Sequence, residues 1–138
     1  MKEIIVPANT NQVDFVTDFV NDQLNELSCP MRAQMQIDVA IDEIFGNIAR
    51  YAYHQPNTGE AVIQVESDDD SLFVTITFID HGKPFDPLKR EDPDVTLSAE
   101  ERDIGGLGIY VVKKTMDGVE YKYEDGKNIL SIKKRING

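Results

Sequence analysis

The sequence has little of several residue types that mark particular classes of protein. Among its 138 residues there is one cysteine, Cys29, and no tryptophan. A single cysteine cannot form an internal disulfide, and the N-terminal residues lack the apolar core of a signal peptide. No hydrophobic run approaches the roughly 20 residues that span a bilayer. The sequence therefore predicts a reduced, cytoplasmic protein without a membrane partner.

Basic residues are also scarce. The chain has 14 Lys and Arg against 25 Asp and Glu, a formal net charge of -11. Such a charge repels the phosphate backbone of nucleic acids at long range, so we expect no direct nucleic-acid partner. The length suits one compact domain, and no internal repeat is present. We therefore expect a single domain over residues 1–138.

Apolar spacing predicts three helices. Apolar residues recur at helical intervals from Val13 to Leu27, and Thr10 can cap this helix. A second helix is predicted from Pro30 towards Tyr53, because isoleucines recur on one face. A third is predicted from a glycine cluster to Met116. Together these helices can cover one face of a sheet.

Alternating apolar residues predict five strands, and the dipeptide Asp125-Gly126 suits a tight hairpin between the last two. The order of elements predicts an α+β fold, a two-layer sandwich of a mixed, mostly antiparallel sheet with helices on one face. Between Phe85 and Ile104 the sequence has little periodicity, so this long segment is either functional or disordered. The predicted strands are 3–6, 61–66, 72–79, 119–124 and 128–136.

The second helix carries the first candidate site. Glu43 and Asn47 are four residues apart and share a face, and Arg50, three residues further on, lies close to it. An amide oxygen of Asn47 together with phosphate oxygens would suit Mg²⁺, and Glu43 could orient a hydroxyl near a terminal phosphate. Taken alone, this spacing more often marks an ordinary solvent-facing surface.

A second candidate follows a predicted strand. Asp80 is an acceptor when ionised, and adenine offers an amino group as donor. Gly82 would let the backbone pass close to a flat base, and Pro84 would stiffen the turn. Taken alone, Asp-x-Gly after a strand is more often a common turn.

The run Gly105-Gly106-Leu107-Gly108 is the third candidate, at the start of the third helix. Exposed N–H groups and the helix dipole would make an anion site there, suited to a polyphosphate. A flexible loop closed by a helix explains the same glycines equally well. The glycine spacing fits neither the dinucleotide fingerprint nor a Walker loop.

These three weak signals name three parts of one ligand, namely a metal with its γ-phosphate, an adenine and a polyphosphate. The stretches DEIFGNIARYAY, DHGKPFDP and GGLGIYVVKKTMD resemble the three nucleotide-binding boxes of the GHKL (histidine kinase-like) ATPase superfamily. The nearest branch is the anti-sigma-factor serine/threonine kinases, and the resemblance covers nearly the whole chain. It implies the GHKL ATP-binding fold, with ATP and Mg²⁺ as cofactors.

The resemblance also implies roles for individual residues. It implies that Glu43 acts in phosphotransfer, that Asn47 coordinates Mg²⁺ and that Asp80 binds adenine. Gly82 corresponds to the glycine beside that Asp, and Gly106 and Gly108 correspond to the glycines of the phosphate loop.

Three further features bear on the resemblance. The pair Pro84-Phe85 is the form seen in the anti-sigma kinases. The segment 86–104 would act as an ATP lid, in which Arg102 is the candidate to contact the terminal phosphate; a surface arginine paired with a neighbouring glutamate is the alternative. Tyr51 departs from the pattern, because many relatives have His at this position.

The function implied is a kinase that phosphorylates a serine of a small anti-anti-sigma (antagonist) protein and sequesters an RNA polymerase sigma factor. The resemblance also implies a possible homodimer. The alternative is a nucleotide-dependent module that switches a partner without phosphotransfer. The presence of Glu43 favours the enzyme, because a binding module does not need a residue placed for hydroxyl activation.

Overall fold

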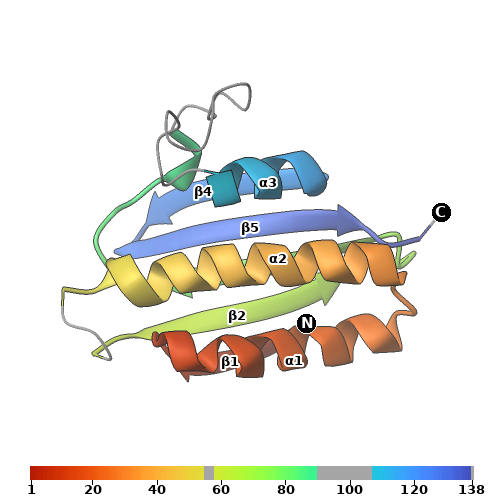
Figure 1. Cartoon of the computed structure of the whole chain (residues 1–138), viewed down its shortest axis with the longest axis horizontal. Coiled ribbons are helices and arrows are strands. Elements are labelled where there is room, and N and C mark those ends of the chain that lie inside the picture. The colour runs from red at the N-terminus through yellow and green to blue at the C-terminus, as the bar shows by residue number, and fades with distance from the viewer. Residues whose placement is uncertain (55–57, 90–106, 138) are drawn as a thin grey trace.

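The computed structural model describes residues 1–54, 58–89 and 107–137, which form a sheet with helices on one of its faces (Figure 1). This arrangement confirms the predicted α+β sandwich. The helices are α1 (Val13–Glu26), α2 (Met31–Asn47) and α3 (Leu107–Thr115). The strands are β1 (Lys2–Pro7), β2 (Glu60–Ser67), β3 (Phe73–Asp80), β4 (Gly118–Glu124) and β5 (Lys127–Arg135).

The five strands form one sheet in the order β1-β2-β3-β5-β4, and all four pairings are antiparallel. Asp125 and Gly126, with φ of 54° and 76°, form the turn between β4 and β5, as predicted. The register of the two central strands pairs Ile76 with Ile132 and Asp80 with Asn128. The same row of inward positions therefore runs from apolar residues to polar ones.

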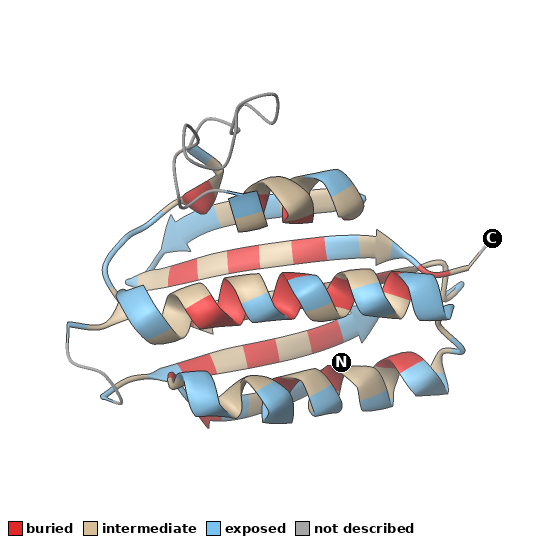
Figure 2. Ribbon diagram, in the orientation of Figure 1, coloured by how far each residue is buried: buried red, intermediate tan, exposed pale blue. Residues whose placement is uncertain are grey.

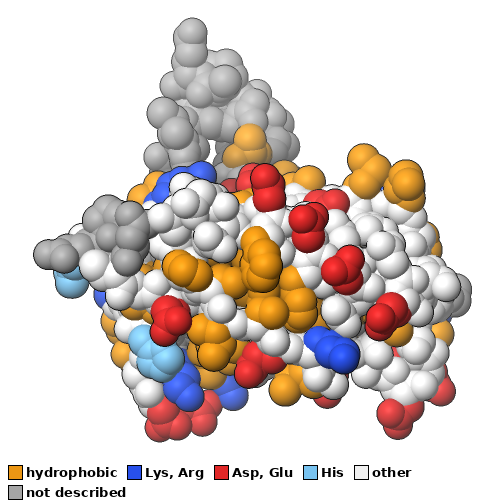
Figure 3. Space-filling view, turned by 90° about the horizontal axis from the view of Figure 1, so that it is seen from below, with side chains coloured by type: hydrophobic (Ala, Val, Ile, Leu, Met, Phe, Trp, Pro, Cys, Tyr) orange, Lys and Arg blue, Asp and Glu red, His pale blue; other side chains and the backbone are white. Residues whose placement is uncertain are grey.

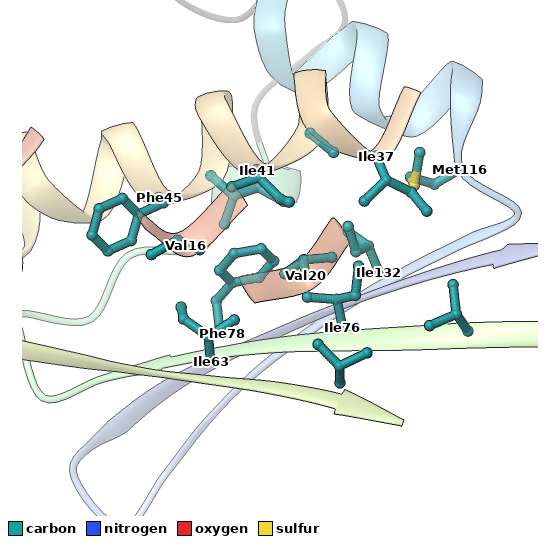
Figure 4. Packing of buried hydrophobic residues seen from close by; sticks show 14 of the residues in the cluster. Val16, Val20, Ile37, Ile41, Phe45, Ile63, Ile76, Phe78, Met116 and Ile132 are labelled. Atoms are coloured by element: carbon teal, nitrogen blue, oxygen red, sulfur yellow. The ribbon is translucent and has the colours of Figure 1, made fainter. Parts of the chain in front are cut away.

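The core lies between the helices and the inner face of the sheet. Burial alternates along the central strands and recurs at helical intervals along α2, as Figure 2 shows. Ile37, Ile41 and Ile44 of α2 are buried, as their spacing predicted. Figure 4 shows side chains of α2 above those of the strands, with Phe78 and Ile76 among them.

The first helix begins later than predicted. A short 3₁₀ turn, Thr10–Gln12, precedes α1, and the side chain of Asn9 accepts a hydrogen bond from the backbone N–H of Asn11. Thr10 is therefore not the cap of α1. Asn has the stronger preference for the cap position, and here it starts the 3₁₀ turn.

The second helix ends differently from an ordinary α-helix. After Asn47 the chain continues into a π-helical turn, Ile48–Ala52. Such turns occur mostly as single turns within helices, often at functional sites. This turn lies where the helix layer reaches the polar end of the central strands.

The side of the molecule that carries α1 and β1 has a mixed surface. Acidic side chains lie beside a central group of hydrophobic ones in the view of Figure 3. Asp14, Asp18 and Asp22 of α1 are exposed, as is Phe15. Separately, none of the helices in the described ranges is long and apolar enough to cross a membrane.

Candidate functional site

A cavity of about 400 Å³ opens where the helix layer and the sheet separate. Its walls come from the C-terminal end of α2 and its π turn, the ends of β3 and β5, the middle of β4, the start of α3 and the segment after β3. The lining residues are Glu43, Ile44, Asn47, Ile48, Tyr51, Ala52, Phe78, Asp80, Lys83, Phe85, Pro87, Ile109, Tyr121, Asn128 and Leu130. The cavity therefore joins the predicted helix site and the predicted Asp site.

Asp80, the last residue of β3, is 4% exposed and lines this cavity. Its Oδ1 accepts hydrogen bonds from the backbone N–H of Gly82 at 2.8 Å and from Nδ2 of Asn128 at 2.9 Å. No described residue forms a hydrogen bond with Oδ2. This oxygen faces no protein donor, so it can accept a hydrogen bond from a ligand in the cavity.

Asn128 is the functional candidate that the sequence motifs missed. It is 6% exposed and pairs directly with Asp80 across the sheet. A signal was present, because Asn128 occupies an inward position of a predicted strand, in line with Leu130 and Ile132. A polar residue on a core-facing row needs hydrogen-bond partners, and this would have identified it.

Gly82 is required by the packing of the chain itself. A Cβ at this position would lie 2.1 Å from the carbonyl oxygen of Ala52. The next residue, Lys83, donates its backbone N–H to the same oxygen at 3.0 Å. The Asp80 turn is thus fixed against the end of the π turn, which holds two walls of the cavity together.

Glu43 and Asn47 lie side by side on α2 and line the same cavity. The Nδ2 of Asn47 donates to Oε1 of Glu43 at 3.1 Å. A Cβ at Gly108 would lie 2.1 Å from Oε2 of Glu43, so only a glycine allows the carboxylate this close to the first turn of α3. The start of α3 favours negative charge because of the helix dipole and its free N–H groups. Glu43 and Asn47 therefore meet Gly108, the last residue of the predicted phosphate loop.

Arg50 does not join this cluster. It is exposed, does not line the cavity, and its guanidinium lies against Gly46, where an added Cβ would be 3.0 Å from one of its terminal nitrogens. The prediction that Arg50 lies close to the face of Asn47 assumed an α-helix. The π turn has more residues per turn, so it rotates Arg50 away from that face.

Two residues near the cavity rim differ in their placement. Pro84 is exposed and does not line the cavity, whereas its neighbours Lys83 and Phe85 do. Tyr51, noted as a departure from the family pattern, is 59% exposed and contributes to the wall. The role of Pro84 stays a prediction, and the side chains on either side of it contribute to the cavity wall.

Part of the predicted site lies outside the described residues. Arg102, Gly105 and Gly106 belong to this part, as does most of the predicted lid, 86–104. Leu107 is the first residue of α3, is 44% exposed and does not line the cavity.

The donor set fits Mg²⁺ only if a ligand supplies most of the oxygens. Within the described ranges, no group of three or more His, Cys, Asp or Glu side chains could hold a metal ion. Asn47 donates to Glu43 through Nδ2, so its Oδ1 stays available as an oxygen ligand. Mg²⁺ is commonly bound by one or two protein oxygens together with substrate phosphates and water. The residues present fit that pattern.

Comparison with known proteins agrees with this geometry. The sequence matches the family model of the histidine kinase-like ATPase domain over residues 6–134. Similar curated proteins are serine-protein kinases named RsbW. The one from Listeria monocytogenes is 29% identical over 101 residues, which cover 70% of this chain and 63% of that relative. The one from Bacillus cereus is 26% identical over 135 residues, 95% of this chain and 82% of the relative.

Solved structures show the same fold. A structure of the RsbU and RsbW domains of a Mycobacterium tuberculosis protein aligns with a TM-score of 0.63 at 15% identity, covering 99% of this chain and 33% of that one. The catalytic domain of the histidine kinase ThkA aligns with a TM-score of 0.53 at 11% identity, covering 99% of both chains. At these identities the likeness establishes the fold alone.

Proposed function

The chain belongs to the histidine kinase-like ATPase domain family, and from this premise we propose that it is a protein kinase that binds ATP with Mg²⁺ in the cavity beside Asp80. The observation that carries the proposal is that three sequence-distant boxes meet at one cavity: Glu43 and Asn47 from the first, Asp80 from the second and the start of α3 from the third. Its volume of about 400 Å³ is in the usual range for small-molecule sites.

The two ends of the cavity suit the two ends of a nucleotide. Asp80 and the apolar wall at Phe78 and Leu130 would take the adenine, with the free carboxylate oxygen accepting from the amino group. The first turn of α3 and Oδ1 of Asn47 would face the triphosphate and its Mg²⁺. When bound, Mg²⁺ would neutralise charge that develops on the phosphate oxygens.

Glu43 would act as the general base in phosphoryl transfer. In the reaction a serine hydroxyl of the partner attacks the γ-phosphorus, the bond to the β-phosphate oxygen breaks and ADP leaves. Glu43 accepts the proton of the hydroxyl, and its hydrogen bond from Asn47 orients the carboxylate. The predicted lid, with Arg102, would close over the site.

We propose a small antagonist protein as the phosphoacceptor and a sigma factor as the second partner. The similarity to serine-protein kinases supports the first of these. The chain matches 63% of the length of the Listeria relative, so both partners are proposals for this chain. Formation of a homodimer stays a prediction.

Two experiments test this function. In the first, a pull-down in the presence of ATP identifies the partner protein. The chain is then incubated with this partner, radiolabelled ATP and Mg²⁺, and the label on serine residues of the partner is measured. Absence of labelled serine, with ATP binding intact, would leave the non-catalytic switch as the function.

The second experiment uses Glu43→Gln, which keeps the shape and the hydrogen bond to Asn47 and removes the base. We expect nucleotide affinity to stay within about threefold and transfer to fall by roughly 10²- to 10⁴-fold. Asp42→Asn, on an exposed position of the same helix, is the matched control. Transfer by Glu43→Gln at the parental rate would show that Glu43 is not the base.

A further inference from the structure

We infer that Asn128 is the positioning residue that makes the cavity selective for a 6-aminopurine, because it commits one oxygen of Asp80 to the protein and leaves the other for the ligand. This inference rests on the proposed nucleotide function. It goes beyond it by assigning base discrimination to a residue of β5 that belongs to none of the three sequence boxes.

The side-chain amide of Asn128 is fully used. Its Nδ2 donates to Asp80 Oδ1 at 2.9 Å and to the carbonyl of Lys83 at 2.9 Å. Its Oδ1 accepts from the backbone N–H of Phe85 at 3.1 Å and from the hydroxyl of Tyr121. A backbone carbonyl can only accept and a backbone N–H can only donate, so these partners fix which amide atom is nitrogen.

This network determines what Asp80 offers to the cavity. Both donors to Asp80, the N–H of Gly82 and Nδ2 of Asn128, contact the same oxygen, Oδ1. They fix the rotation of the carboxylate and saturate one side of it, so the remaining acceptor is Oδ2. A purine with an amino group at position 6 can donate to this oxygen, whereas a 6-oxo purine presents a carbonyl that repels it.

Asn128 also holds part of the cavity wall in place. Through Lys83 and Phe85 it ties β5 to the segment that follows β3. Lys83, Phe85 and Tyr121 all line the cavity. One side chain therefore fixes both the free oxygen of Asp80 and the cavity wall beside it. Loss of Asn128 should affect the recognition of the purine more than the binding of the phosphates.

The test compares ATP with ITP, which differ only in the 6-position of the purine and its N1 proton. Titration calorimetry with Mg²⁺ gives the ratio of the two dissociation constants for the parent and for Asn128→Leu, which keeps the approximate volume without hydrogen bonds. We expect the preference for ATP to fall by about tenfold in Asn128→Leu. Ser131→Ala is the control, because Ser131 lies on the outer face of the same strand, bonded to Thr77 at 3.0 Å.

Thermal unfolding of each variant ensures that only folded protein is titrated. If Asn128→Leu does not fold, Tyr121→Phe provides the test. It removes one donor to Asn128 Oδ1, and we expect the ATP preference to fall by about threefold.

Equal weakening of ATP and ITP in the folded variant, with an unchanged ratio, would overturn the inference and leave Asn128 a structural residue only. A parental protein that binds neither nucleotide would instead refute the proposed function itself.

Discussion

The middle and the end of the central strands are built on the same pattern but serve different purposes. At Ile76 and Ile132 the inward row is closed over by α2, and both side chains are 1% exposed. Four residues further along β3 the inward pair is Asp80 and Asn128, and α2 has passed into its π turn. Alternation along the strand thus sets which face a residue occupies, and the helix packed over that face determines whether it is core or cavity.

A substitution in the middle of the central strand should change stability most. We expect Ile76→Ala to reduce the free energy of unfolding by about 2–5 kcal/mol, because it removes fully buried atoms and leaves a cavity. Urea unfolding measures this. ATP affinity of the folded protein should stay unchanged. Ile79→Ala, on the outer face of the same strand, is the control with a smaller cost; equal costs would show that the middle of the sheet is not the dominant core.

A substitution at the end of the same strand, Asp80→Asn, should weaken ATP binding. Asp80→Asn keeps an oxygen for Gly82 and Asn128, and it replaces the free oxygen with an NH₂ group that repels the adenine amino group. We expect a loss of about 1.5–3 kcal/mol in ATP binding, with little change in unfolding. Calorimetry with ATP and ITP measures it, and ITP should lose less. Retention of full ATP affinity would mean that the base does not contact Asp80.

The sequence was sufficient to predict the fold, because its apolar periodicity matches the burial of the strands and helices. It also predicted that Glu43, Asn47 and Asp80 would serve one ligand, and these three do line one cavity. Their roles stay predictions. Arg50 was expected close to the face of Asn47 because rules of helical spacing assume 3.6 residues per turn. The local sequence does not predict the π turn that follows Asn47.

Asn128 was missed for a different physical reason. Its importance comes from pairing between strands that are far apart in the sequence, and a motif search examines only neighbours along the chain. The same holds for Gly82. The Asp-x-Gly turn was identified, but its contact with the carbonyl of Ala52 depends on where the π turn ends.

The two glycines of the site differ in what surrounds them, because Gly82 faces a backbone atom and Gly108 faces the end of a side chain. In Gly82→Ala the new Cβ would lie 2.1 Å from a backbone oxygen, and we expect a cost of about 1–3 kcal/mol in unfolding. In Gly108→Ala the clash is with the end of the Glu43 side chain, which can rotate away. We therefore expect a smaller loss of stability there and a loss of phosphotransfer. Urea unfolding and the transfer assay separate the two, and the reverse order of stabilities would contradict the distinction.

Tyr53, next to the π turn, should give stability a weak dependence on pH. The hydroxyl of Tyr53 donates to the carbonyl of Glu60 at 2.6 Å and accepts from the N–H of His81 at 3.0 Å. Burial raises the pKa of Tyr53, so the folded state holds the phenolic proton more tightly than the unfolded chain does. This contribution to stability is complete below the unfolded pKa of about 10 and is lost as the pH rises through the folded pKa.

Tyr53→Phe lacks this dependence. We expect it to be about 1 kcal/mol less stable than the parent at neutral pH, since it loses the hydrogen bonds of the hydroxyl. The gap between the two proteins should narrow above about pH 10, because only the parent then loses stability through this proton. Urea unfolding at a series of pH values measures the gap. Parallel curves would show that the contacts of Tyr53 with Glu60 and His81 do not tie the end of the π turn to β2 and β3 in solution.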